Sequence, residues 1–156
     1  MSSNKMIEKL FPKNLDNQYS GLAIAKWVFV AMTILTIARS LAHIFLPDGG
    51  AQSIATIALN EFPAEASAVI IGIFSYWGWS QLLFGLFFVI VLWRYQSLIP
   101  LMWLFIFTEW VGRYLLETFY KPIETVGTAP GKVGNMIFPI ISFVMLILAL
   151  QRQKNK

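Results

Sequence analysis

Hydrophobic residues occur along this chain in four long runs, which shorter polar segments separate. The runs cover about residues 24–46, 66–93, 98–120 and 134–150. A helix needs about 20 apolar residues to cross the roughly 30 Å hydrocarbon layer of a bilayer, and these runs approach or exceed that length. Because backbone groups in lipid must be hydrogen-bonded within the protein, we expect the runs to be helices. The pattern predicts an all-α membrane protein, a bundle of four transmembrane helices.

The composition agrees with a membrane protein and narrows its chemistry. Of the 156 residues, 57% are hydrophobic and 13% are charged, whereas a typical soluble domain has about 25% charged residues. The absence of cysteine excludes disulfides and thiolate metal sites. The single histidine excludes a bis-histidine haem or a zinc site of several histidines built from this chain alone. We therefore predict no metal site, and no motif identifies a cofactor.

Basic residues gather on one side of the predicted spans. They lie before or at the start of the first span, between the second and third spans, and after the fourth span. The positive-inside rule therefore places both termini of a multi-pass membrane protein in the cytoplasm. Because these cations lie at membrane edges, no nucleic-acid partner is expected. The basic residues of this side are Lys5, Lys9, Lys13, Lys26, Arg94, Arg152, Lys154 and Lys156.

The spans divide the chain into three segments. Residues 21–150 form the predicted membrane domain, and residues 151–156 form a basic C-terminal tail. In residues 1–20, apolar side chains recur at helical spacing opposite lysines, which is typical of an amphipathic helix on the inner leaflet. A basic tail that only sets the orientation explains the same residues. Pro12 limits any helix there to about two or three turns.

Two longer loops are expected on the outer side. The first begins with Pro-Asp-Gly-Gly at residues 47–50, a strong turn signal. It continues with residues 53–59, whose apolar positions share a helical face that Ser53 can cap. This predicts a short helix, either at the membrane interface or as a cap over the mouth of the bundle. The second loop, residues 121–132, is predicted to be irregular, with its glycines in turns.

Ionisable side chains inside the apolar runs mark the candidate site. A charged side chain at the centre of a membrane helix costs about 2.5–3.5 kcal/mol on insertion scales, so it usually faces a partner or a cavity. In the first span, Arg39 and His43 lie on one helix face. In the third span, Glu109, Arg113 and Glu117 lie four residues apart and form a second polar stripe.

The depth of these residues along the spans brings both stripes to one outward-biased zone, to which Gln81 of the second span also belongs. We expect Arg39 to hold an anionic or carbonyl group that Glu109 orients. We expect His43 and Glu117 to exchange protons near the outer surface. No catalytic residue is identified. The candidate ligand-binding or proton-exchange residues are Arg39, His43, Gln81, Glu109, Arg113 and Glu117.

Two interpretations of this network stay open. Ion pairs along the third helix, and a pair between Arg39 and Glu109, could simply hold the bundle together, because buried pairs are often retained for specificity. Alternatively, the network also lines a ligand site, since five ionisable groups, Gln81 and several hydroxyls are more than is needed to hold helices together. Trp77, Trp79 and Trp110 could wall an aromatic cavity or could pack against neighbouring helices.

Several local features also occur together in a known family. They are Ala-Arg-Ser at residues 38–40 of the first span, an outer loop with proline and glycine, Gln-Leu-Leu-Phe-Gly-Leu at residues 81–86, and the Trp-Arg-Tyr turn at residues 93–95. Over about residues 24–150, this layout resembles the DoxX-like group of small four-span bacterial membrane proteins. The resemblance implies a place in the bacterial inner (plasma) membrane and, as for some members, association with a quinone-linked oxidoreductase. Residues 47–50 and 109–113 depart from the group's pattern, and no catalytic residue is carried over.

We therefore expect a small polytopic membrane protein whose polar pocket binds a small or amphipathic ligand, such as a lipid or a quinone-like molecule. It would serve as a membrane subunit of a redox or envelope system, and whether it catalyses a reaction stays open. An oligomeric transporter or channel subunit is one alternative. An assembly or scaffold subunit without a site of its own is another. Spaced small residues in the second span suit a homo-oligomer or a partner membrane subunit.

Overall fold

The computed structural model describes residues 3–151, and these residues form helices joined by turns and loops. Helix α1 (Ser3–Leu10) comes first within this part of the chain. Four later segments, with α4 counted together with its short flanking helices, are long and apolar enough to cross a membrane by length and composition. This finding confirms the predicted all-α architecture with four spans. The later helices are α2 (Ala23–Phe45), η1 (Leu59–Glu61), α3 (Ala64–Arg94), η2 (Gln96–Leu98), α4 (Ile99–Leu115), η3 (Leu116–Tyr120) and α5 (Pro130–Leu150).

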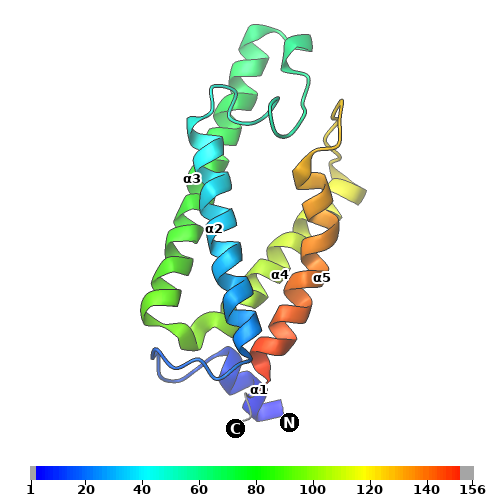
Figure 1. Ribbon diagram of the computed structural model, residues 1–156. Helices are drawn as coiled ribbons and strands as arrows, with labels where there is room; N and C mark the ends of the chain where they lie inside the picture. Colours follow the sequence, from blue (N-terminus) through cyan, green and yellow to red (C-terminus); the bar gives the residue numbers. More distant parts are fainter. Residues whose placement is uncertain (1–2, 152–156) are drawn as a thin grey trace.

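The four long helices form two antiparallel hairpins, α2 with α3 and α4 with α5 (Figure 1). The hairpins meet near α1, at the closed end of the molecule, and diverge toward the opposite, open end (Figure 1). Near the closed end, Phe29 of α2 packs edge-to-face against Phe88 of α3 and Trp103 of α4. The Trp103 indole N–H also donates a hydrogen bond to the Ala25 carbonyl at 3.1 Å. The largest core cluster therefore joins the hairpins in the half of the bundle near the closed end.

The N-terminal segment is bound across the closed end. Lys9 donates hydrogen bonds to the carbonyl oxygens of Leu150 and Gln151, both at 3.0 Å, where α5 ends. A cation is favourable there because the last carbonyls of a helix lack partners within the helix. Further along, the Asp16 N–H donates to the Ser97 hydroxyl, which donates to the Asp16 carbonyl. These contacts attach the segment to α5 and to the α3–α4 connection.

The predicted short N-terminal helix is present and ends at Leu10, before Pro12. Its apolar residues Met6 and Ile7 are exposed, as is the following Phe11. This surface suits contact with a membrane interface, and the position of α1 on the inner leaflet stays a prediction. Most of the predicted basic tail, residues 152–156, lies outside the described residues.

The start of α5 corrects the expected span at residues 134–150. The helix begins at Pro130, so Gly131 and Gly134 are helical and do not lie in loop turns. Proline fits the first turn of a helix because its fixed backbone angle is helical and its missing N–H would have no partner there. The irregular outer loop is therefore shorter than expected.

The helix expected over residues 53–59 is not formed, and hydrogen-bonded turns lead instead to η1. The Asp48 carboxylate accepts hydrogen bonds from the backbone N–H groups of Gly50 at 2.9 Å, Gln52 at 3.0 Å and Ser53 at 2.6 Å. The Ser53 hydroxyl donates to the same carboxylate at 3.1 Å and caps no helix. One side chain thus gathers the donors of this loop into a turn.

Two glycines of α3 allow close contact with α2, as the spaced small residues of this span suggest. A Cβ atom added at Gly78 would lie 2.7 Å from the Cβ atom of His43 and 3.0 Å from the carbonyl oxygen of Ser40. A Cβ atom added at Gly85 would lie 2.7 Å from a side-chain carbon of Ile37. The close approach fixes the face of α2 that carries His43 against α3.

Candidate functional site

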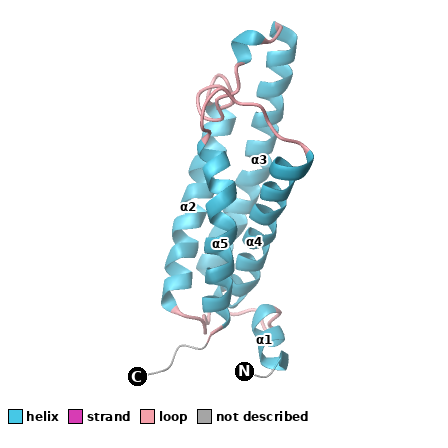
Figure 2. Cartoon of the chain, turned by 90° about the vertical axis from the view of Figure 1, so that its right-hand side faces the viewer, coloured by secondary structure: helices cyan, strands magenta, loops and turns pink. Residues whose placement is uncertain are grey.

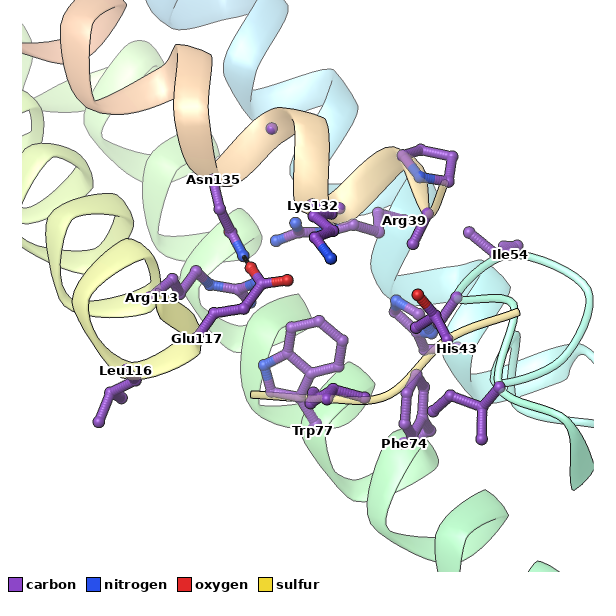
Figure 3. A pocket seen from close by; sticks show the side chains of 18 of the residues that line it. Arg39, His43, Ile54, Phe74, Trp77, Arg113, Leu116, Glu117, Lys132 and Asn135 are labelled. Carbon is purple, nitrogen blue, oxygen red and sulfur yellow. Dashed lines mark hydrogen bonds between the residues drawn. The ribbon is translucent and has the colours of Figure 1, made fainter. Parts of the chain in front are cut away.

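A pocket of about 630 Å³ lies between the two hairpins toward the open end. Helices α2, α3, α4 and α5, the π-helical turn η3 and both outer loops contribute to its wall. Of the six candidate residues, four line this pocket, and Gln81 and Glu109 do not. The four that line it are Arg39, His43, Arg113 and Glu117 (Figure 3).

Gln81 connects the charged residues of the two hairpins. The Arg39 Nη2 group donates to Gln81 Oε1 at 2.6 Å, and Gln81 Nε2 donates to Glu109 Oε1 at 3.2 Å. The same Glu109 oxygen accepts a hydrogen bond from Arg113 Nε at 3.0 Å, which is the expected pair one helical turn apart. Glu109 therefore orients Arg39 through the Gln81 amide, and the direct pair considered from the sequence is replaced by a relay.

Two indole rings hold both guanidinium groups. The Arg39 guanidinium carbon lies 5.4 Å from the Trp77 ring centroid and 5.3 Å from that of Trp110. The Arg113 guanidinium carbon lies 4.6 Å and 5.1 Å from the same two centroids. These distances are in the range of cation–π attraction. Trp77 and Trp110 therefore wall the cavity, one of the two roles the sequence left open, whereas Trp79 is exposed and does not line it. The sequence does contain a signal for this role, because helical spacing puts Trp77 on the same face as Gln81 and Trp110 on the same face as Arg113.

His43 fastens the first outer loop to α2. Its Nδ1 atom lies 2.7 Å from the carbonyl oxygen of Gly49. Because a carbonyl oxygen only accepts, Nδ1 carries the proton, and Nε2 is the basic nitrogen of the neutral ring. The ring packs against Trp77, with centroids 4.7 Å apart, and against Phe74 at 5.5 Å. His43 is thus a buried aromatic wall of the pocket as well as an anchor for the loop.

Glu117 binds to the fourth span and not to His43, the partner expected from depth. The Asn135 amide N–H donates to the Glu117 carboxylate, and the two side chains point toward one another in Figure 3. Glu117 lies on η3, where Lys121 N–H bonds to Leu116 O five residues earlier. Such a π-helical turn rotates the residues after it relative to a regular α-helix. The polar stripe of the third span therefore divides, with Arg113 on Glu109 and Glu117 on Asn135.

The two outer loops meet at the open end, where Figure 2 shows the loops gathered above α2 and α5. The Val126 N–H donates to the Thr56 carbonyl at 3.0 Å, and the Thr56 hydroxyl donates to the Gly127 carbonyl at 3.1 Å. Ile54 and Ile57 of the first loop line the pocket. This geometry agrees with the cap interpretation of the first loop, although the cap consists of turns and not of a helix.

A charged carboxylate stabilises this cap. Burial raises the pKa of Asp48, but the hydrogen bonds from Ser53, Gly50 and Gln52 lower it more strongly, so that the pKa of Asp48 lies below its ordinary value. The folded turn therefore favours the ionised side chain. The ionised form accepts every hydrogen bond that the turn directs at it.

Two polar atoms at the pocket are buried without a hydrogen-bond partner among the described residues. They are Nε of Arg39, a donor, and Oδ1 of Asn135, an acceptor. Buried polar groups are normally hydrogen-bonded, so the polar network in the pocket wall is incompletely paired. Both atoms are covered by the protein and do not face the pocket.

No protein-family model, curated protein or solved structure matches the chain. The resemblance to the DoxX-like group therefore stays a prediction.

Proposed function

We propose that this chain is a small ligand-binding membrane protein whose pocket takes the polar head of an amphipathic molecule. The observation that carries the proposal is the pair of guanidinium groups, Arg39 and Arg113, held between two indole rings at the wall of a largely apolar pocket. A network that only holds helices together would use the ion pair of Arg113 with Glu109, but it would not need a cavity beside that pair. Sites for small ligands are typically apolar pockets with a few placed polar groups.

We also propose how the protein is oriented in the membrane and which membrane holds it. Lys9, Lys13, Lys26 and Arg94 belong to segments of the closed end, so the positive-inside rule supports a cytoplasmic closed end and a pocket in the outer half of the bilayer. We place the protein in the bacterial inner membrane, as a subunit of a redox or envelope system. This setting rests on the resemblance to the DoxX-like group and on the number of spans.

Native mass spectrometry of the protein purified in mild detergent tests the proposal. We expect the wild type to retain a bound amphiphile and Leu35→Trp to lose it, because Leu35 lines the pocket and the larger ring fills part of it. The matched control is Ile34→Trp, since Ile34 is 63% exposed and does not line the pocket. The same occupancy in all three proteins, or no bound amphiphile in the wild type, would contradict the proposal and favour a scaffold subunit.

A further inference from the structure

The pocket has an excess of positive charge. Arg39, Arg113, Lys121 and Lys132 line it, together with one carboxylate, that of Glu117. Even when Glu109 is added, four cations face two carboxylates, which leaves two positive charges. Lys121 and Lys132 are exposed at the rim, whereas the two arginines lie deeper between the indoles. Charges of one sign along a cleft with apolar walls attract a ligand of the opposite sign.

The arginines keep donors for such a ligand. A guanidinium has five N–H donors in a planar fork that matches carboxylate and phosphate oxygens. The hydrogen bonds to Gln81 and Glu109 use Nη2 of Arg39 and Nε of Arg113. Nη1 of Arg39 and both Nη groups of Arg113 have no hydrogen-bond partner among the described residues and are not covered by the protein. The contacts of both guanidinium groups with the indoles of Trp77 and Trp110 restrain them, so a ligand has less to order.

The apolar part of the pocket continues into the surface that faces lipid. Leu35 of α2, Ile73 of α3 and Leu116 of η3 line the pocket and are 44%, 60% and 55% exposed. In Figure 3, Leu116 points away from the polar side chains. By contrast, hydrogen bonds between Thr56 and residues 126–127 bridge the end that faces water. Access through the sides, between the diverging hairpins, therefore suits a molecule with hydrocarbon chains.

From the charge, the available donors and the apolar sides, we propose that the ligand is an anionic phospholipid that enters the pocket sideways from the outer half of the bilayer. Its phosphate would lie between the two arginines and Lys132, and its chains would pass Leu35 and Leu116. This inference rests on the proposed function and names the ligand class of the same pocket. It distinguishes an anionic lipid from a neutral lipid, a quinone and a soluble anion, all of which an amphipathic or cationic site could accept.

The test is a titration of the detergent-solubilised protein, followed by tryptophan fluorescence and by the melting temperature. The probes are dioctanoyl phosphatidylglycerol, dioctanoyl phosphatidylcholine, decylubiquinone and inorganic phosphate. We expect phosphatidylglycerol to bind at least about tenfold more tightly than the quinone, which has no anionic group, and than phosphatidylcholine, whose phosphate is accompanied by a choline cation that the arginines and lysines would repel. We also expect this preference to weaken with added salt, and inorganic phosphate to give no saturable signal over the same range.

Two lysine variants assign the effect to the pocket. Lys132→Gln should weaken phosphatidylglycerol binding severalfold and phosphatidylcholine binding less, because the loss of this cation also removes a repulsion of choline. The variant should fold normally because Lys132 is exposed. Lys13→Gln makes the same change at an exposed residue of the N-terminal segment and should alter neither affinity.

The outcomes separate this inference from the proposed function. Equal binding of both lipids, unaffected by Lys132→Gln but reduced by Leu35→Trp, would overturn the anionic lipid and leave the pocket as a ligand site. Tighter binding of the quinone than of phosphatidylglycerol would also overturn the anionic lipid and leave the pocket as a ligand site. Binding of inorganic phosphate as tight as that of the lipid would make the ligand a soluble anion. If no probe binding depends on Leu35, the proposed function fails as well.

Discussion

Gln81 lies between two groups of opposite charge, and its amide suits both. Its carbonyl oxygen accepts from Arg39 and its amino group donates to Glu109. A carboxylate at this position would repel Glu109, and a cation would repel Arg39. A neutral side chain with one acceptor and two donors is therefore the residue type that lets the hairpins share a charged network.

The relay predicts a specific loss of stability. Gln81→Leu should lower the free energy of unfolding in detergent by about 1–3 kcal/mol, because Arg39 and Glu109 each lose the hydrogen bond that the buried Gln81 amide makes with them. Denaturant titration followed by circular dichroism measures this loss. Ser80→Leu is the control, since Ser80 is exposed and its hydroxyl bonds only to Tyr76 of its own helix. An equal loss in both variants would show that the relay does not stabilise the fold.

Among the elements, α2 and α3 depend on the absence of a side chain at one position. Gly78→Ala should lower the melting temperature, because the added Cβ atom would meet His43 and the Ser40 carbonyl and would push the helices apart, at a cost of about 1–3 kcal/mol. Gly72→Ala is the matched control on the same helix, where a Cβ atom meets no other atom within 4 Å. It should be neutral or slightly stabilising, since alanine favours a helix more than glycine does. Similar destabilisation by both changes would contradict this packing.

The spans were predictable because each helix repeats one simple property, an apolar run of sufficient length. Local turns were harder. Residues 130–132 were predicted as part of a loop because proline and glycine occur there, yet Pro130 fits the first turn of α5. Residues 53–59 have a helical pattern, but the Asp48 carboxylate captures the N–H groups nearby and imposes turns. In both cases a single side chain decided the local structure, and the periodicity of the segment did not.

Four ionisable residues of the pocket wall could be predicted from the sequence, whereas most of their hydrogen-bond partners could not. Arg39, His43, Arg113 and Glu117 stood out as ionisable residues in apolar runs, and all four line the pocket. Their partners depend on rotamers and on how the hairpins diverge, which spacing along one helix does not determine. Trp77 was ambiguous because an indole suits lipid, a core and a cavity equally well.

For the whole molecule, the orientation in the membrane predicts which positions are accessible from outside. The chain has no cysteine, so single cysteines can be introduced without background. Gln52→Cys and Thr128→Cys, both exposed in the outer loops, should react with an impermeant thiol reagent in intact cells. Asn17→Cys, exposed at the closed end, should react only after the cells are permeabilised, which also serves as the positive control. Labelling of Asn17→Cys alone in intact cells would reverse the orientation.

The division of polar contacts between the hairpins also bears on biosynthesis. The first hairpin is made before the second, and within it Arg39 already has Gln81 at 2.6 Å. In the second hairpin, Arg113 has Glu109 on its own helix at 3.0 Å. Each hairpin can therefore pass from the insertion machinery into lipid with its arginine hydrogen-bonded, before the other is present. Only the hydrogen bond between Gln81 and Glu109 forms after the hairpins assemble. The chain can therefore enter the membrane in two steps, and neither step leaves Arg39 or Arg113 in lipid without a hydrogen-bond partner.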